Sequence, residues 1–301
     1  MTQRNNEKRL GLPTPGASQS VDVPPPIVAP QQQPPTDNNL SYISPTELVA
    51  LPSKGVLYAE DHPLHGSSDI ELREMTAKEE DILTTQSFIQ KGIVFERLLQ
   101  SLIVDKSIKV GDLLIGDKNA LLIAARSSGY GNIYDTHVAC PACGHEEDFG
   151  FDLNDCRITS PVDLETTEDE ELVTYVSEGT SGRYFVTLPK SNATMEVRLM
   201  TGKEETEFAQ QREMRRKKKL PESPLTDHFR KITLSVNGVT ESLPIRRFIE
   251  SMPASDSRFL RRIFAKITPN IEMAQEFVCP DCEYEQDLEV PLTATFFWPD
   301  A

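Results

Sequence analysis

Two short cysteine turns of the same design constrain this chain more than any other feature. The first lies in VACPACGHEEDFGFDL (residues 138–153) and the second in FVCPDCEYEQDLEVPL (residues 277–292), with Cys140 and Cys279 separated by 139 positions. Apolar residues alternate with polar ones beside each turn, which predicts two strands joined by the turn. Two thiols in a tight turn between strands are typical of half a zinc ribbon, and a second such turn is needed for the other two ligands.

The sequence therefore predicts one structural Zn²⁺ site that leaves no position open for a catalytic water. The predicted ligands are Cys140, Cys143, Cys279 and Cys282. The turns of an ordinary ribbon lie about 15–20 residues apart, whereas 135 residues separate Cys143 from Cys279. We therefore expect a whole helical segment between the two half-ribbons, with the ion fastening both halves across a pseudo-twofold axis. A site shared between two chains and turns without metal stay open as alternatives.

A redox role for the two turns, and metal binding by Cys156 or His145, are less consistent with the sequence. A redox CxxC motif normally opens a helix, which lowers the pKa of one thiol, but a strand is predicted after each turn here. Cys156 has no CxxC partner and is expected to be a small buried side chain. His145 follows the first turn and is expected to be an exposed polar residue rather than a ligand.

An internal repeat accompanies the two cysteine turns. Seven of the ten positions from Glu71 to Glu80 are identical to those from Glu196 to Glu205. Both copies read as a strand followed by a helix with a capping box. A helix is also predicted before each turn, over residues 116–131 and 255–270. The offset between the copies grows from 125 to 139 residues, which predicts an insertion in the second copy, around residues 214–228.

These patterns predict an α+β fold of two pseudo-repeated helical lobes joined by a zinc-ribbon-like β element. The predicted segments are a disordered Pro-rich tail (1–40), a first repeat (41–159), an acidic linker (160–182) and a second repeat (183–301). The tail is too polar to offset the entropy of its ordering. Within these segments, residues 44–47 resemble a helix start, and residues 172–176 of the otherwise solvated linker resemble a strand.

Composition and motifs exclude several functional classes. The net charge of −16 argues against a general nucleic-acid binder, because phosphate contacts require clustered cations. The chain has no run of about 18 apolar residues for a membrane span and no secretory h-region. It lacks HExxH, GxSxG, GxxxxGK[ST] and GxGxxG, so no enzymatic activity is predicted. Arg215–Lys219 (RRKKK) is expected to be either a solvated helix end or a contact for phosphate or an acidic partner.

Several blocks of the first repeat occur in an order that carries a family resemblance. These blocks are LPSKGVLY (51–58), IELREMTAKEEDILTTQSFIQKG (70–92), RLLQSLI (97–103), GDLLIGDKNALLIAARSSGYG (111–131) and CPACG (140–144). Over about residues 48–155 the chain resembles the baseplate protein family of T-even-type contractile-tailed bacteriophages. The resemblance supplies no catalytic residues.

The resemblance implies a non-enzymatic baseplate hub protein, or a chaperone for hub assembly, that binds hub or tail subunits. It places the chain in the host cytoplasm during assembly, with the virion tail as a further location, and leaves the oligomeric state open. A zinc-ribbon regulator that binds nucleic acid through RRKKK is the alternative, opposed by the acidic balance and by the shortage of nearby aromatic residues. A metal-dependent hydrolase is disfavoured, because four thiolates saturate the ion.

Overall fold

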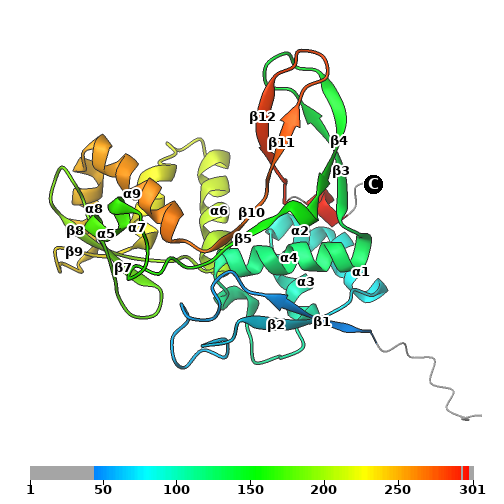
Figure 1. Ribbon diagram of the computed structural model, residues 1–301, viewed down its shortest axis with the longest axis horizontal. Coiled ribbons are helices and arrows are strands. Elements are labelled where there is room, and N and C mark those ends of the chain that lie inside the picture. Colours follow the sequence, from blue (N-terminus) through cyan, green and yellow to red (C-terminus); the bar gives the residue numbers. More distant parts are fainter. Residues whose placement is uncertain (1–43, 293, 298–301) are drawn as a thin grey trace, which may run out of the picture. The chain divides into compact units, whose positions relative to one another are not determined.

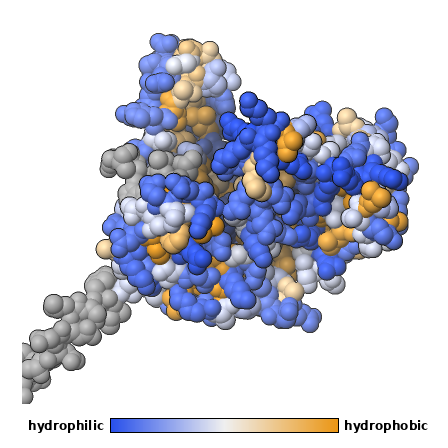
Figure 2. Space-filling view, turned by 180° about the vertical axis from the view of Figure 1, so that it is seen from behind, coloured by the Kyte–Doolittle hydropathy of each residue, from blue (hydrophilic) through white to orange (hydrophobic). Residues whose placement is uncertain are grey.

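The computed structural model describes residues 44–292 and 294–297, so the predicted tail lies outside the described residues. The described part is a mixed α/β structure with nine α-helices and with strands in several small sheets (Figure 1). This confirms the predicted mixture of helices and strands. None of the described helices is long and apolar enough to cross a membrane. Hydrophilic side chains dominate the face that Figure 2 shows, and hydrophobic ones form separate patches on it.

The first part of the chain packs a two-stranded sheet against four helices. The strands are β1 (Thr46–Ala50) and β2 (Asp69–Arg73). The helices are α1 (Ala77–Thr84), α2 (Gln86–Lys91), α3 (Val94–Leu102) and α4 (Ile115–Tyr130). Ile70 of β2, Leu98 of α3 and Leu121 of α4 share one hydrophobic cluster. Their burial follows from the period of two in the strand and of 3.6 in the helices.

Strand β1 corrects one expectation from the sequence. The helix start expected at residues 44–47 does not form, and Thr46 instead begins a strand. The strand pairs antiparallel with β2 along its whole length, from Thr46↔Arg73 to Ala50↔Asp69. This pairing satisfies the backbone of a short segment and places Val49 against the core, which outweighs the local preference for a helix start.

The second part of the chain is built on a four-stranded antiparallel sheet. The strands, in spatial order, are β6 (Val176–Glu178), β7 (Arg183–Thr187), β8 (Thr194–Arg198) and β9 (Thr233–Val236). The helices are α5 (Glu170–Tyr175), α6 (Gly202–Lys217), α7 (Pro224–Ile232), α8 (Ser242–Ser251) and α9 (Ala254–Ile267). A second hydrophobic cluster joins this sheet to α5, α7, α8 and α9, and Val197, Phe229 and Leu260 are among its most deeply buried members.

The expected solvated linker contributes to this second cluster. Residues 170–175 form helix α5, where a strand was expected over 172–176, and only Val176 begins β6. The Asp169 side chain accepts hydrogen bonds from the N–H groups of Glu171 and Leu172, so an N-cap starts the helix. Leu172 and Val176 are buried in the cluster, and apolar burial therefore orders part of an acidic segment.

Two β-hairpins and a short ladder make up the remaining part. The hairpins are β3 (Ile133–Ala139) with β4 (Glu146–Asp152), and β11 (Ala274–Val278) with β12 (Glu285–Glu289). The ladder pairs β5 (Arg157–Thr159) with β10 (Asn270–Glu272). Figure 1 shows the two hairpins side by side, with their turns at the same end. Segments about 140 residues apart in sequence thus become neighbours.

Candidate metal centre

The four cysteines of the two turns come together at the ends of the two hairpins. Their Sγ atoms all lie within 4.8 Å of one another. Sγ of Cys140 lies 3.7 Å from Sγ of Cys282, and Sγ of Cys143 lies 3.7 Å from Sγ of Cys279. The first cysteine of each turn therefore faces the second cysteine of the other, which is the reciprocal pattern of a twofold relation. Cys140 and Cys279 are buried, and Cys143 and Cys282 are exposed.

These distances fit a tetrahedral metal ion. Zinc bonds thiolate sulfur at about 2.3 Å, so two sulfurs of a regular tetrahedron lie about 3.8 Å apart. The observed 3.7 Å between facing Sγ atoms matches this edge. A disulfide would require the two sulfurs to lie about 2.05 Å apart, and all the cysteines are free thiols in the described structure. Four soft sulfur donors in this arrangement can hold a metal ion.

Each turn is closed by the same backbone hydrogen bonds. The N–H of Cys140 donates to the carbonyl of His145 (2.8 Å), and the N–H of Gly144 donates to the carbonyl of Cys140 (2.9 Å). In the second turn, Cys279 donates to Tyr284 (3.0 Å) and Glu283 donates to Cys279 (2.9 Å). A residue in the left-handed region follows the second cysteine of both turns, with φ of 76° at Gly144 and 56° at Glu283. The two turns are therefore local copies of one structure.

The thiols of the cluster differ in pKa. The backbone N–H groups of His145 and Tyr284 act to lower the pKa values of Cys143 and Cys282, but burial and the neighbouring thiols raise them overall. The N–H groups of Cys143 and Ala142 point at the Cys140 thiol and lower its pKa to about 6, although burial acts in the opposite direction. The thiolate is the form of cysteine that binds metals. Strand β4 follows the first turn and β12 follows the second. The arrangement therefore lacks the helix N-terminus that a redox CxxC motif uses to activate its thiol.

Aromatic side chains join the two hairpins below the cysteines. The ring of Phe149 on β4 meets that of Phe277 on β11 edge to face, with centroids 5.5 Å apart. Phe149 also contacts Phe151, whose ring stacks on Tyr134 of β3. Phe277 packs with Cys140 and Cys279 in a small cluster of its own, whereas Phe151 and Tyr134 belong to the first hydrophobic cluster. A continuous series of aromatic contacts thus connects the cysteine site to the first hydrophobic cluster.

A side-chain amide adds a second joint between the hairpins. Nε2 of Gln275 donates to the carbonyl of Asp152 (2.6 Å), and the N–H of Asp152 donates to Oε1 of Gln275 (3.0 Å). The amide thereby imitates one rung of a β-ladder between β11 and β4. The β5–β10 ladder is the third joint. Neither Gln275 nor the contact between Phe149 and Phe277 was predicted, because the alternating pattern shows which side chains turn inward but not which hairpin they meet.

Cys156 and His145 lie outside this cluster. Cys156 is half-buried, burial raises the pKa of its thiol, and it packs against the first hydrophobic cluster. The His145 side chain is exposed, and only its carbonyl takes part in the turn. Among the described residues, the four turn cysteines form the only group of His, Cys, Asp or Glu side chains close enough to share a metal.

Buried carboxylates mark equivalent positions in both parts of the chain. Asp117 on α4 accepts hydrogen bonds from the N–H and Oγ of Ser53. Asp256 on α9 accepts from the N–H groups of Lys190 and Ser191. Both carboxyl groups are almost fully buried and hold the loop before a strand, and these neutral donors supply the hydrogen bonds that a buried polar group requires. The sequence signal was only the shared separation of 139 residues from Asp117 to Asp256.

The capping boxes recur in the same way. Thr76 and Glu79 cap α1, and Thr201 and Glu204 cap α6. Each glutamate also pairs with an arginine at the end of the preceding strand, Glu79 with Arg73 and Glu204 with Arg198. Strand, arginine and capped helix therefore occur twice in the described structure.

Comparison with known proteins adds one finding to this geometry. Residues 48–175 match the model of a family described as T4 bacteriophage base plate protein. The matched segment contains most of β1, all of β2–β5 and α1–α5, and the first cysteine turn. No curated protein and no solved structure matches the chain. The match confirms the resemblance read from the sequence blocks and supports a T4-type baseplate protein family for this chain.

Proposed function

We propose that this chain is a non-enzymatic baseplate protein of a contractile phage tail, acting as a hub component or as a chaperone that holds hub or tail subunits before assembly. The single observation that carries this proposal is the family match over residues 48–175. The expected location follows from it, the host cytoplasm during assembly and the tail baseplate in the virion.

The proposed structural role of the cysteine site is a Zn²⁺ clamp. Cys140, Cys143, Cys279 and Cys282 would hold the ion, which would supply a cross-link between two hairpins that the chain forms far apart in sequence. Binding of a structural zinc contributes on the order of 10 kcal/mol to folding. Four thiolates complete the tetrahedron, so the ion has no coordination position for substrate or water. This supports a structural function over a hydrolytic one.

The clamp would set the relation between two repeated units. The paired features that support a repeat are the two cysteine turns, the two capping boxes with their arginines, and the two buried aspartates. The first hydrophobic cluster contains side chains of β2 and α1, and a separate second cluster contains side chains of β8. A rigid joint between two units would hold two protein-binding surfaces at a fixed angle, which suits an assembly factor or hub subunit more than an enzyme.

A capture experiment with a matched metal-site variant tests the proposal. A tagged wild-type chain and a Cys143→Ser/Cys282→Ser variant are expressed in infected cells, and co-purified proteins and purified virions are analysed by mass spectrometry. We expect the wild type to recover hub or tail proteins and the variant to recover fewer of them. The proposed function is wrong if no hub or tail protein co-purifies with this chain and the chain is also absent from the virions.

A further inference from the structure

The charges of this chain are divided between two surfaces. Residues 133–159 and 270–289, which contain both hairpins, hold 13 Asp or Glu residues and a single cation, Arg157. The net charge of the whole chain is −16, so the hairpins account for most of it. By contrast, residues 212–219 at the end of α6 hold six Lys or Arg residues and one Glu. Such a separation creates opposite potentials on one molecule.

The second hairpin presents an acidic face, which we define as Glu276, Glu285, Asp287 and Glu289. All four side chains are exposed, and the period of two along β12 places its three acids on the same side of the hairpin. Glu276 on β11 lies directly opposite Asp287, where like charges repel. In the part of the chain that the structure describes, none of the four forms an ion pair.

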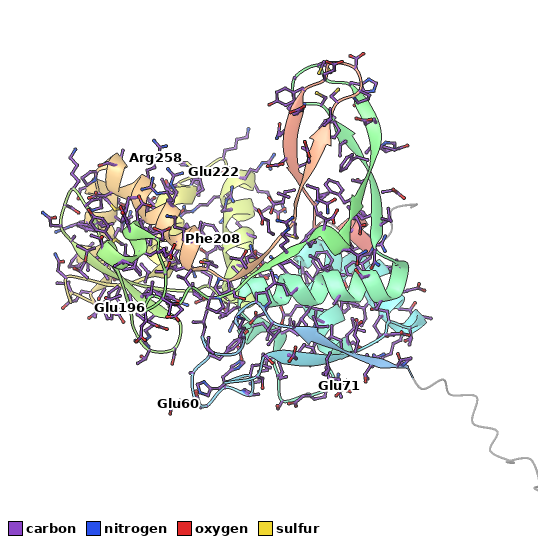
Figure 3. The ribbon with its side chains drawn as sticks, in the orientation of Figure 1. Glu60, Glu71, Glu196, Phe208, Glu222 and Arg258 are labelled. Carbon is purple, nitrogen blue, oxygen red and sulfur yellow. The ribbon has the colours of Figure 1, made fainter. Side chains whose placement is uncertain are left out.

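The far end of α6 presents a basic face, which we define as Arg212, Arg216, Lys218 and Lys219. Arg212 and Arg216 are four residues apart on α6 and therefore lie on one side of the helix. Lys218 and Lys219 directly follow its last residue, Lys217. Residues 209–214 are all exposed. Figure 3 shows the helix extending from Phe208 toward Glu222, which lies beyond its end.

The cations of this face have few partners of their own. Arg212 lies over the ring of Phe208, with Cζ 6.0 Å from the centroid. Nearby, Arg215 pairs with Asp227 and Lys217 pairs with Glu213. Within residues 44–292 and 294–297, no ion pair involves Arg216, Lys218 or Lys219. Among the described residues, the carboxylates of the acidic face therefore have no paired cations. Three cations of the basic face likewise have no paired carboxylates.

We propose that the basic face of one copy of this chain docks on the acidic face of a second copy. Charge complementarity argues for this occupant: four exposed cations at and just beyond the C-terminal end of α6 match four exposed carboxylates on the second hairpin. Because the contact joins two different surfaces, it is heterologous, and every added copy leaves one face of each kind free until a ring closes. The pairs are exposed, so the association is weak and sensitive to salt.

Sedimentation velocity of the full-length chain, purified with zinc, tests this contact. A basic-face variant carries Arg216→Glu and Lys219→Glu, and an acidic-face variant carries Glu276→Lys and Asp287→Lys. The control variant, Glu60→Lys and Asp61→Lys, makes the same change in net charge as the acidic-face variant on a separate exposed loop (Figure 3). Circular dichroism confirms that each variant is folded. The runs cover a wide range of protein concentration at about 0.15 M and about 1 M salt.

The wild type and the control are expected to associate with rising concentration in moderate salt and to dissociate in high salt. Each face variant alone should associate at least tenfold more weakly. A mixture of the two face variants should form a complex again, because the acidic face of one remains complementary to the basic face of the other.

Three results would overturn the proposal. The first is a wild type that stays monomeric at every concentration. The second is a control that dissociates as much as the face variants do. The third is a mixture that forms no complex, since this would place the charge pairing within a single copy. A monomeric wild type that binds duplex DNA, and loses this binding in the basic-face variant, would assign the basic face to nucleic acid instead.

Discussion

The residue after the second cysteine of each turn offers a test of the turn geometry. Gly144 and Glu283 occupy the same place, and both have a positive φ, 76° and 56°. Glycine adopts this region freely, whereas a residue with a Cβ adopts it at a cost of about 1–2 kcal/mol. The chain has therefore placed the favourable residue in one turn and an unfavourable one in the other.

The expected effects have opposite signs. A Cβ added at Gly144 would meet no atom within 4 Å, so Gly144→Ala changes only the backbone preference and should destabilise the fold by about 1 kcal/mol. Glu283→Gly removes the same strain, and the entropy that glycine adds to the unfolded chain offsets part of the gain. A net stabilisation of roughly 0.5–1 kcal/mol remains.

Urea unfolding of the zinc-loaded full-length chain measures both effects. Because Glu283→Gly also removes a negative charge from an acidic hairpin, Glu283→Gln serves as the control for charge alone. The difference between the glycine and glutamine variants then reports the backbone contribution. If Glu283→Gly is no more stable than Glu283→Gln, or if Gly144→Ala is neutral, the argument from the left-handed conformation is refuted.

Three further predictions concern other contacts. Hydrogen bonds from Arg73, Ser101 and Thr76 outweigh the effect of burial and lower the pKa of Glu79 to about 2. A lowered folded-state pKa contributes stability above the unfolded value of 4.5 and loses it as pH falls toward 2. Glu79→Gln should therefore lower the free energy of unfolding by about 3 kcal/mol at neutral pH and by less in acid. Urea titrations at several pH values measure this loss, and a loss that does not change with pH would contradict the prediction. Phe277→Ala should cost about 3–5 kcal/mol in the same assay, with Phe277→Leu nearer the wild type, and equal losses would argue against an aromatic contact between the hairpins. Asp256→Asn should lower the free energy of unfolding by about 1–3 kcal/mol, because one backbone N–H loses its acceptor. The control Glu241→Gln, at an exposed carboxylate, should be neutral. Equal effects of the two substitutions would refute the buried loop contact.

The cysteine cluster could be predicted because its signal is local and occurs twice. Two thiols at a fixed spacing between alternating residues mark each turn in the sequence, and strands β3 and β11 precede the two turns as the alternation predicts. The duplicated turn suggested the partner, and the structure places all four Sγ atoms together. Zinc as the occupant stays a prediction.

The joints between the hairpins could not be predicted, because they depend on which element each side chain meets. In the sequence, Gln275 is an ordinary polar residue of a predicted strand. The structure shows that its side-chain amide forms two hydrogen bonds with the backbone of Asp152. Similarly, Thr46 lies in a segment whose local signals favour a helix start, and only pairing with β2 makes it a strand. The acidic residues around Leu172 resemble a solvated linker, and the cluster that buries this leucine comes from distant strands and helices.

The most direct test of the central claim is zinc K-edge X-ray absorption of the full-length wild-type chain, with the metal quantified in the same sample. The claim is that two distant turns of one polypeptide hold one ion between them. We predict one zinc per chain, surrounded by four sulfur atoms at about 2.3 Å. A zinc shell with fewer than four sulfurs, half an equivalent of zinc per chain, or a folded chain without zinc would contradict it.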